Sequence, residues 1–555
     1  MKKLLSFEGL LLVAIAVAIV LRVVNLGSRE FWYDEVLSLL LSSGQKINYH
    51  HPGDLPVVLA DYTALLHLPL ENNWTDILHT GKKLLKGLVA EPHPPLFFLG
   101  QHLWLRLFGN SEIATRSLPM LFSIGAIGCA YGLGKYLLGN RGGLLLAALL
   151  GLNPYYLFHS LNVRMYCSLV FWVILSAWSL LESLPNTAIN NKQEILPTDS
   201  NRRKILWNLI FIISIIGGLL TFYYFVIWLI ALAIIVFWLG QKQWWQYLLW
   251  VTIAILPVIP WFYWGTRQQL RNADLERFAT TSNLLTATTR HFQETFAVFG
   301  IHLLLGDWAT ILPTAVILLA GIAAIALLIV AATSLWRQRQ YQLLVIASLL
   351  GWIPFLLMLG IDIISGKFTV GFGWGRSVIF ILPGCLLLIT AWLVSQREKW
   401  RQTVAIALLV LYLTIDLADF QLRSRLMFHQ VADIIAAKPN SPTLIVMDSP
   451  AWGHVLRLAY YLPPTSPVML LAQNANNLAP ALQKTLKSQP HQYQRIIWLE
   501  SARSVWGKPS TDAQRKQINQ ILERDFQQQK TQLLRGTWEL DDFTLKLYQP
   551  KSMTY

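Results

Sequence analysis

Two adjacent carboxylates, Asp34 and Glu35, follow three aromatic residues in the segment "REFWYDEVLS" (29–38). The segment begins a few residues after a long apolar run, where aromatic side chains are typical of a membrane–water interface. A carboxylate at such a boundary can serve as a general base that takes a proton from an attacking hydroxyl or amine. The same pair also suits the solvated start of an ordinary loop, so its role depends on what lies near it.

A histidine and a third carboxylate lie in "EPHPPLFFLG" (91–100). The consecutive prolines favour an extended segment that leads into a new helix. This arrangement would hold Glu91 and His93 at the mouth of that helix. A histidine beside such a helix start can also be purely structural.

Two arginines open segments that are otherwise apolar. Arg164 and Tyr166 begin one in "HSLNVRMYCSL" (159–169), and Arg376 follows the glycine-rich start of "GFGWGRSVIFILPG" (371–384). Near bilayer depth an arginine is costly, and it either finds a partner or extends its side chain to the surface. Because a guanidinium group pairs with two phosphate oxygens at once, these arginines suit a phosphate held at the headgroup plane. Together with the carboxylates they predict group transfer from a lipid-anchored phosphate donor.

The composition indicates a polytopic membrane protein. Of the 555 residues, 54% are hydrophobic and 14% are charged, and the mean hydropathy is +0.45; soluble chains differ clearly from this. The formal net charge of +15 is expected to mark loops that face the cytoplasm, not a nucleic-acid partner. Cys129, Cys167 and Cys385 all fall within apolar runs, which argues against a disulfide framework or a structural zinc site.

Eleven segments are predicted to span the membrane, because each offers a mostly apolar run of roughly 20 residues. They are 10–26, 113–138, 142–161, 164–182, 205–220, 222–239, 245–264, 310–334, 342–361, 376–395 and 402–420. Basic clusters at every second junction place the N-terminus in the cytoplasm and the C-terminus outside. The short segment 96–109 carries Gln101, His102 and Arg106 and is predicted to lie at the interface instead.

The expected fold class is an all-α polytopic membrane protein of about eleven transmembrane helices, with outer-face interfacial helices and a small C-terminal α/β domain. The predicted domains are residues 1–420, with outer loops at 27–112 and 265–309, and residues 421–555. Residues 183–204 are predicted to form a polar cytoplasmic linker.

The tail after residue 420 differs in character from the rest. Strand-like runs at 443–448, 495–500 and 543–549 alternate with helical stretches such as 513–532, which is typical of a small α/β domain. No glycine-rich fingerprint follows these strands, so no nucleotide cofactor is expected. An accessory or acceptor-positioning role and a purely structural role both remain open for this domain.

Taken together, the motifs resemble the GT-C superfamily of membrane glycosyltransferases, in the branch of protein O-mannosyltransferases and lipid A aminoarabinose transferases. The resemblance rests on "WYDEVLS" (32–38), His-Pro-Pro-Leu (93–96), "LFGNSEIATRSLP" (107–119) and "NPYYLFHSLNVRMY" (153–166). It covers residues 5–240 well. Further along, Arg376 with Pro383 is similar to the family's Arg-before-Pro segment.

The resemblance implies an inverting transfer of a sugar from a polyprenyl-phosphate donor to a protein, lipid or glycan acceptor on the outer face. Asp34 would be the general base, and Glu35 would tune its charge or contact the acceptor. Some relatives bind a divalent metal near this acid, which makes Asp34 and Glu91 candidate ligands. Cys167 and Ser168 stand near the place where some relatives carry another acidic residue, so a third carboxylate is in doubt.

For the substrates, the resemblance implies that Arg164 and Arg376 hold the donor phosphate and stabilise the charge that develops as the sugar leaves. Tyr166 completes the Arg-x-Tyr pattern beside Arg164 as a substrate-binding residue. His93 and Glu91 would line the acceptor entrance.

Two other functions remain open. A flippase or transporter of lipid-linked glycans would carry charges near the membrane midplane, whereas here the polar residues gather on one face. An oligosaccharide ligase or polymerase would use the same outer arginines on a preassembled glycan. In each case the expected location is the plasma (inner) membrane of a bacterium, with the C-terminal domain periplasmic or extracellular. The expected partners are the donor, the acceptor and membrane lipids, and not nucleic acid.

Overall fold

The computed structural model describes residues 6–184, 200–240, 243–272, 284–395, 398–423, 425–488, 492–503, 505, 509–536 and 541–551. They form two compact units. The helical unit comprises Met1–Leu26, Leu88–Phe97 and Arg116–Gln421, and the sheet unit comprises Gly27–Gly87, Phe98–Thr115 and Leu422–Tyr555. Parts of the predicted linker 183–204 and of the predicted outer loop 265–309 lie outside the described residues.

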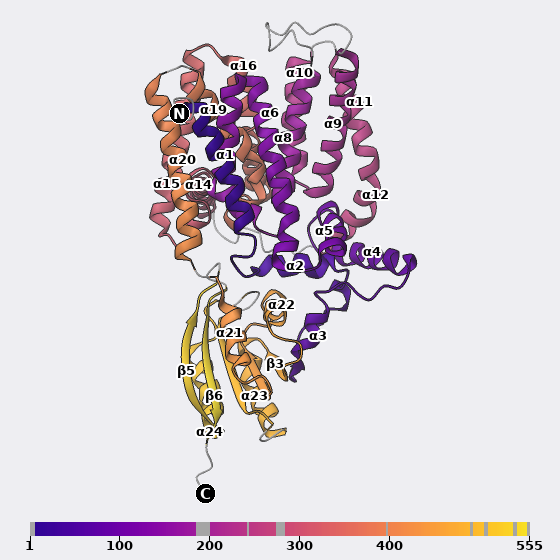
Figure 1. The fold of residues 1–555 in the computed structure, drawn as a ribbon, viewed down its shortest axis with the longest axis vertical. Coiled ribbons are helices and arrows are strands. Elements are labelled where there is room, and N and C mark those ends of the chain that lie inside the picture. The colour runs from indigo at the N-terminus through magenta and orange to yellow at the C-terminus, as the bar shows by residue number, and fades with distance from the viewer. Residues whose placement is uncertain are drawn as a thin grey trace. The chain divides into compact units, whose positions relative to one another are not determined.

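Eight helical stretches of the described chain are long and apolar enough to cross a membrane, or nine if one bent pair is a single span. Figure 1 shows long helices of this unit running alongside one another. Their bounds are α1 (Phe7–Val24), α6 (Glu112–Leu152), α8 (Tyr166–Ser183), α9 (Ser200–Thr221), α11 to α13 (Trp244–Asn272), α15 (Thr314–Arg337), α18 to α19 (Phe372–Val394) and α20 (Lys399–Leu422). The bent pair is α16 (Tyr341–Leu349) with α17 (Trp352–Ser365), which meet at 42°. The predicted count of eleven spans is therefore not confirmed.

Shorter elements complete the helical unit. They are α7 (Pro154–Ser160), α10 (Phe225–Leu239), α11 (Trp244–Ile255), η3 (Leu256–Val258), α12 (Ile259–Trp261), η4 (Phe262–Thr266), α13 (Arg267–Asn272), α14 (Leu284–Gly300), η6 (Ile301–Leu305), η7 (Gly306–Thr310), α18 (Phe372–Gly375), η8 (Arg376–Ile381) and α19 (Leu382–Val394). With 15 residues, the apolar helix α10 is shorter than each of the eight long stretches.

The long element α6 is a helical hairpin. A straight helix of its 41 residues would be about 60 Å long, roughly twice the thickness of the hydrocarbon core. Gly139, with φ 76° and ψ 180°, breaks the helix, and the Oγ atoms of Ser123 and Ser160 lie 2.7 Å apart because the chain returns. The predicted spans 113–138 and 142–161 correspond to the two arms, which is one reason why the count of long helices is below eleven.

Arg22, the polar interruption in the first predicted span, links α1 to both arms of this hairpin. Its side chain donates to Ser123 Oγ (2.8 Å), Ala18 O (2.8 Å) and Gly151 O (2.7 Å). Because a buried charge needs polar partners, these bonds explain how an arginine is accommodated inside an apolar bundle.

Close backbone packing makes Gly384 of α19 a sensitive position. A Cβ atom there would lie 1.8 Å from Leu350 O, whereas one at Gly360 of α17 would meet nothing within 4 Å. We expect Gly384→Ala to lower the free energy of unfolding by about 1–3 kcal/mol, because the helices must separate. Gly360→Ala, the matched control, should raise it by about 1 kcal/mol through helix propensity. Thermal unfolding in detergent measures both, and equal unfolding temperatures for the two variants would contradict this packing.

The sheet unit is built on a six-stranded mixed sheet in the order β1-β3-β2-β4-β6-β5. Its strands are β1 (Val57–Val58), β2 (Thr443–Met447), β3 (Val468–Ala472), β4 (Arg495–Ser501), β5 (Phe526–Leu534) and β6 (Phe543–Pro550). Strands β3, β2 and β4 are parallel, and β1, β6 and β5 pair antiparallel to their neighbours. The helices of this unit are α2 (Tyr33–Ser42), α3 (Leu59–Ala64), α4 (Trp74–Leu88), α5 (Leu96–Phe108), α21 (Met427–Ala436), α22 (Trp452–Tyr461), α23 (Ala475–Ser488) and α24 (Asp512–Asp525), with η1 at Lys46–Asn48; α4 and α5 run one or two residues into the helical unit.

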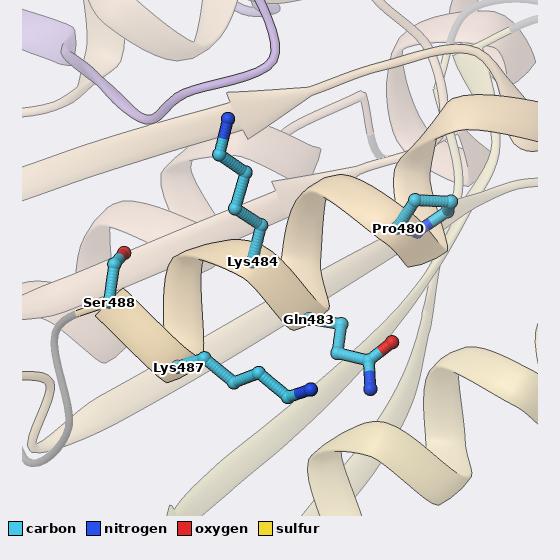
Figure 2. Close-up of a pocket in the computed structure, with 5 residues that line it drawn as sticks. All are labelled: Pro480, Gln483, Lys484, Lys487 and Ser488. Atoms are coloured by element: carbon cyan, nitrogen blue, oxygen red, sulfur yellow. The ribbon is translucent and has the colours of Figure 1, made fainter.

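One core of the sheet unit lies between the sheet and two helices. Val446 and Trp498 from the central strands pack with Leu482 of α23 and Leu522 of α24, and all four are fully buried. Outside this core, a shallow hollow of about 480 Å³ runs along α23, lined by Pro480, Gln483, Lys484, Lys487 and Ser488. Figure 2 shows Lys484 and Lys487 extending in different directions, so their ammonium groups do not converge on one point.

The sequence expectations for this unit are partly met. The strand-like runs at 443–448, 495–500 and 543–549 are strands β2, β4 and β6. The prediction of a helix over 513–532 is wrong in its second half, because the chain enters β5 at Phe526. Only the first and last residues of this strand are buried. Residues from the predicted loop 27–112 also belong here, and β1 pairs with β3.

Candidate functional site

The turn between α7 and α8 positions Arg164 and Tyr166. Asn153 begins α7 by accepting a bond from Tyr156 N–H to its Oδ1 (2.9 Å), and Pro154 occupies the first helical position. The chain then turns, and α8 starts at Tyr166. Arg164 is 5% exposed and Tyr166 is 2% exposed. The local sequence therefore buries both residues at the start of an apolar helix.

Arg164 lies against His93 of the His-Pro-Pro motif. The guanidinium Nη2 is 2.9 Å from His93 Nε2, although the two residues are 71 positions apart. An arginine only donates, so His93 Nε2 is the acceptor in this contact. The backbone carbonyl of His93 accepts from Gln269 Nε2 (2.9 Å), which fixes the segment. The structure thus brings together two of the predicted substrate-binding residues.

Aromatic rings continue from this pair along the helical unit. The ring of Phe222 lies 6.3 Å from His93, in a stacked arrangement, and 6.3 Å from Tyr166. On the other side of Tyr166 is His159, at 4.8 Å, and next to it Tyr155, at 4.6 Å from His159. These rings form a continuous layer that starts beside Arg164.

Arg376 follows a left-handed turn at the far end of this layer. Gly373, Trp374 and Gly375 have φ values of 55°, 62° and 78°, a conformation that costs a non-glycine residue about 1–2 kcal/mol. The Trp374 carbonyl accepts from the Tyr155 hydroxyl (3.2 Å), which stabilises the turn. The Arg376 guanidinium lies 4.9 Å from the centre of the Phe372 ring.

His302 supports the same turn. Its ring stacks on Tyr155 at 4.2 Å, and its Nε2–H donates to Gly375 O (3.1 Å). Burial lowers the pKa of His302 to about 3, so the ring is neutral at ordinary pH. Through Tyr155, the elements that hold Arg164 and Arg376 belong to one connected layer.

The residues before the turn are anchored by Asp362, at the end of α17. Its carboxylate accepts from Thr369 N–H (2.7 Å), Val370 N–H (2.8 Å) and the Thr369 hydroxyl (2.6 Å). The Ser377 hydroxyl, just after Arg376, donates to Thr369 O (2.6 Å). Both sides of the turn are therefore tied to the same backbone. No local sequence signal predicts this role, because Asp362 lies inside an apolar helix.

The predicted catalytic pair lies in the sheet unit, in the first turn of α2. Glu35 is fully buried, and its Oε2 accepts from Trp32 N–H (3.0 Å), as in a capping box. Asp34 is half-buried in the same turn, where the helix dipole favours a negative charge. Glu35 therefore has a clear structural role, and the catalytic role of either carboxylate stays a prediction.

Glu91 lies in the helical unit, on the segment between α4 and α5, and its N–H donates to Leu88 O (3.0 Å). The two carboxylates predicted as metal ligands, Asp34 and Glu91, thus belong to different units. Within the described residues, no group of three or more His, Cys, Asp or Glu side chains converges as a metal site requires. Metal binding by Asp34 and Glu91 therefore stays a prediction of the resemblance.

Sequence reasoning missed the role of Glu30, which precedes the acidic pair. Its carboxylate is fully buried and accepts from the N–H groups of Phe428 (3.1 Å) and His429 (2.6 Å) at the start of α21. It also accepts from His429 Nδ1–H (2.7 Å). The sequence around Glu30, between Arg29 and Phe31, offers no local signal for this contact.

The bond to Glu30 raises the pKa of His429 above its ordinary value, and the charges of Glu112 and Asp433 act in the same direction. A raised folded-state pKa contributes stability that is fully present below the unfolded pKa of about 6.5 and is lost as the pH rises through the folded pKa. We expect wild type to be more stable than His429→Gln at about pH 5, with the difference narrowing as the pH rises. Thermal unfolding at pH values from about 5 upward measures this difference in stability. His50→Gln is the control, because His50 is exposed. A pH-independent difference would contradict the assignment.

Of the comparisons with known proteins, only the one with solved structures finds similar proteins. No family model matches the chain, and no curated protein matches it. The crystal structure of ArnT from Cupriavidus metallidurans bound to undecaprenyl phosphate aligns with 98% of this chain and 98% of its own, at 14% identity and a TM-score of 0.41. The Archaeoglobus fulgidus oligosaccharyltransferase in complex with zinc and sulfate aligns with 93% of this chain and 71% of its own, at 11% identity and a TM-score of 0.47.

A further similar structure is the archaeal oligosaccharyltransferase AglB from Archaeoglobus fulgidus with an inhibitory peptide and a dolichol-phosphate. It aligns with 93% of this chain and 72% of its own, at 10% identity and a TM-score of 0.44. ArnT and AglB are both GT-C proteins, the class that the sequence motifs resemble. Because similarity of fold does not establish activity, the proposed function rests on the residues of this chain.

Proposed function

We propose that this protein is an inverting glycosyltransferase that moves a sugar from a polyprenyl-phosphate donor to an acceptor on the outer face of the plasma membrane. The observation that carries the proposal is the contact between Arg164 and His93 (2.9 Å). It joins a buried guanidinium and an imidazole from two separate motifs in a unit of membrane-spanning helices, and these are the groups that would bind a lipid-borne phosphate.

In this proposal Arg164 binds two oxygens of the donor phosphate through its planar fork. His93 supplies an additional hydrogen bond, and Arg376 adds positive charge. Negative charge grows on the phosphate oxygen as the bond between this oxygen and the anomeric carbon breaks. Hydrogen-bonding groups of the protein that are already oriented toward this oxygen stabilise the transition state more than the ground state.

The acceptor supplies the nucleophile. Asp34 takes the proton from its hydroxyl or amine as that atom bonds to the anomeric carbon. The lipid phosphate leaves from the opposite face with the electron pair of the broken bond, so a single displacement inverts the configuration. Tyr166 and Glu91 complete the predicted substrate-binding set, Tyr166 beside the phosphate and Glu91 toward the acceptor.

The test is a transfer assay with the purified protein in bilayers. Labelled polyprenyl-phosphate sugars are the donors, and membrane extract supplies protein, lipid and glycan acceptors. Transfer of a single sugar supports the proposal. Transfer only of a preassembled glycan would assign an oligosaccharide ligase or polymerase, and lipid movement across the bilayer without transfer would assign a flippase.

Metal dependence is a separate prediction from the sequence resemblance and is measured in the same assay. Loss of transfer on chelation, restored by a divalent cation, would support it. Full activity in chelator would remove the predicted metal from the mechanism and leave the roles of Asp34 and Arg164 intact.

A further inference from the structure

Residues 30–33, just before the acidic pair, are held by the C-terminal part of the sheet unit. Glu30 N–H donates to Arg425 O (3.2 Å), and the Glu30 carboxylate accepts from the first turn of α21 through Phe428 and His429. These partners lie about 400 positions away in the chain. Glu30 therefore fixes the backbone four residues before Asp34.

Two aromatic residues of this segment, Phe31 and Tyr33, contact α22. Phe31 N–H donates to the Tyr461 hydroxyl (2.6 Å), and the Phe31 ring lies 4.9 Å from Tyr460. The Tyr33 ring meets His454 edge-on at 5.2 Å. A Cβ atom at Gly453 would lie 2.6 Å from the Tyr33 ring, so the helix fits this ring without room for a larger residue.

Beneath these contacts is a buried charge network. Arg457 Nη1 donates to Asp541 Oδ1 (2.6 Å), and Arg457 Nη2 lies 4.0 Å from Glu30 Oε2. His454 Nε2 lies 3.6 Å from the same Asp541 oxygen. The side chains of Arg457, Asp541 and Glu30 are 0–1% exposed. Burial acts to raise the pKa of Asp541, but Arg457 and His454 beside it together outweigh burial and lower the pKa, so the carboxylate is charged.

Such a network is stable only when complete, because removing one charge leaves the others buried without compensation. Arg457 is the shared member: it faces Glu30 on one side and Asp541 on the other. Arg457 therefore couples the position of Asp541, two residues before β6, to the segment that carries Asp34.

We propose that Arg457, held in place by Asp541, is a positioning residue that orients the segment 29–35 and thereby sets the catalytic position of Asp34. The inference rests on the proposed function. It assigns the C-terminal domain an indirect role in the reaction, through residues that position Asp34 and never touch the substrate.

The test compares Asp541→Asn with Asp448→Asn in the full-length protein. Asp448 is also buried in the sheet unit, but its carboxylate accepts from Ser501 N–H (2.7 Å) and the Ser510 hydroxyl (2.6 Å). It is therefore a matched control for loss of a buried charge. The two readouts are amide hydrogen exchange of residues 29–38 and steady-state transfer kinetics with varied donor.

We expect Asp541→Asn to speed exchange in residues 29–38 by at least about tenfold, and to lower kcat by up to about 10²-fold, the effect of a displacement near 1 Å. The KM for the donor should not change, because the donor-phosphate residues lie elsewhere. Asp448→Asn should leave both readouts near wild type. Asp541→Glu, which keeps the charge, should recover part of the loss.

Equal exchange and equal kcat in the two asparagine variants would overturn the proposal. If Asp541→Asn fails to fold, Arg457→Lys takes its place, since it keeps the positive charge but has no second nitrogen with which to face both Asp541 and Glu30. Unchanged exchange and kcat in that variant would also overturn the proposal. The exchange readout does not depend on transfer. Absence of transfer by wild type would therefore refute the proposed function, while exchange still decides whether Asp541 orders this segment.

Discussion

Asp34→Asn should lower kcat for sugar transfer by about 10²–10⁴-fold, the range expected when a general base is removed. Asparagine keeps the shape of the side chain but cannot accept the acceptor's proton. Binding of the donor should persist, because Arg164 and His93, which we assign to the phosphate, are unchanged. The measurement is single-turnover transfer, combined with donor binding by the same preparation.

Two variants make this result specific. Asp61→Asn is the matched control, because Asp61 is an exposed carboxylate in the first turn of another short helix, α3, of the same unit. Glu35→Gln should weaken the cap of α2 and cost about 1 kcal/mol of stability, with a smaller effect on the chemical step. Full activity of Asp34→Asn, or equal losses in Asp34→Asn and Asp61→Asn, would remove Asp34 from the mechanism.

Arg164→Gln should lower kcat/KM by about 10²–10³-fold, as loss of an oriented donor to a developing oxyanion does. The variant also leaves His93 without the guanidinium that contacts it at 2.9 Å. Arg164→Lys should recover only part of the activity, because an ammonium group cannot bind two phosphate oxygens in one plane. Donor binding and transfer kinetics separate the two effects.

Arg271→Gln is the control for loss of one positive charge, since Arg271 is an exposed arginine of α13 in the same unit. It should leave kcat/KM near wild type. Donor affinity that falls equally in the Arg164 and Arg271 variants would indicate a general electrostatic effect and would contradict a specific phosphate site.

The sequence predicts that His93 and Arg164 share a location, because both residues lie at predicted helix starts on the outer face of the membrane. It does not predict the contact itself. Local signals carried the inference of a shared location: consecutive prolines before one helix, and the apolar segment that Arg164 and Tyr166 open before the other. Such signals act over a few residues, and hydropathy alone indicates which ends of the helices share a face.

The roles of Glu30 and Asp362 could not be predicted in the same way. Glu30 finds its partners about 400 residues later in the chain, and no local pattern encodes that distance. Asp362 resembles a polar interruption in an apolar helix until the turn it anchors is folded against it. Strand β5 was missed because an edge strand with exposed glutamines shows little of the apolar alternation that marks a half-buried strand.

The sheet unit is assembled from three stretches of chain, and this has a consequence for biosynthesis. Its first two stretches end at Thr115, and the third begins at Leu422. At a ribosome speed of about 5–20 residues per second, roughly 15–60 seconds of translation separate them. During that interval Glu30 has no helix to cap, and Arg457 gains Asp541 only after a further 84 positions of chain have been made. The segment that carries Asp34 and Glu35 therefore gains these contacts only after the candidate membrane spans of the described chain before Leu422 have been translated.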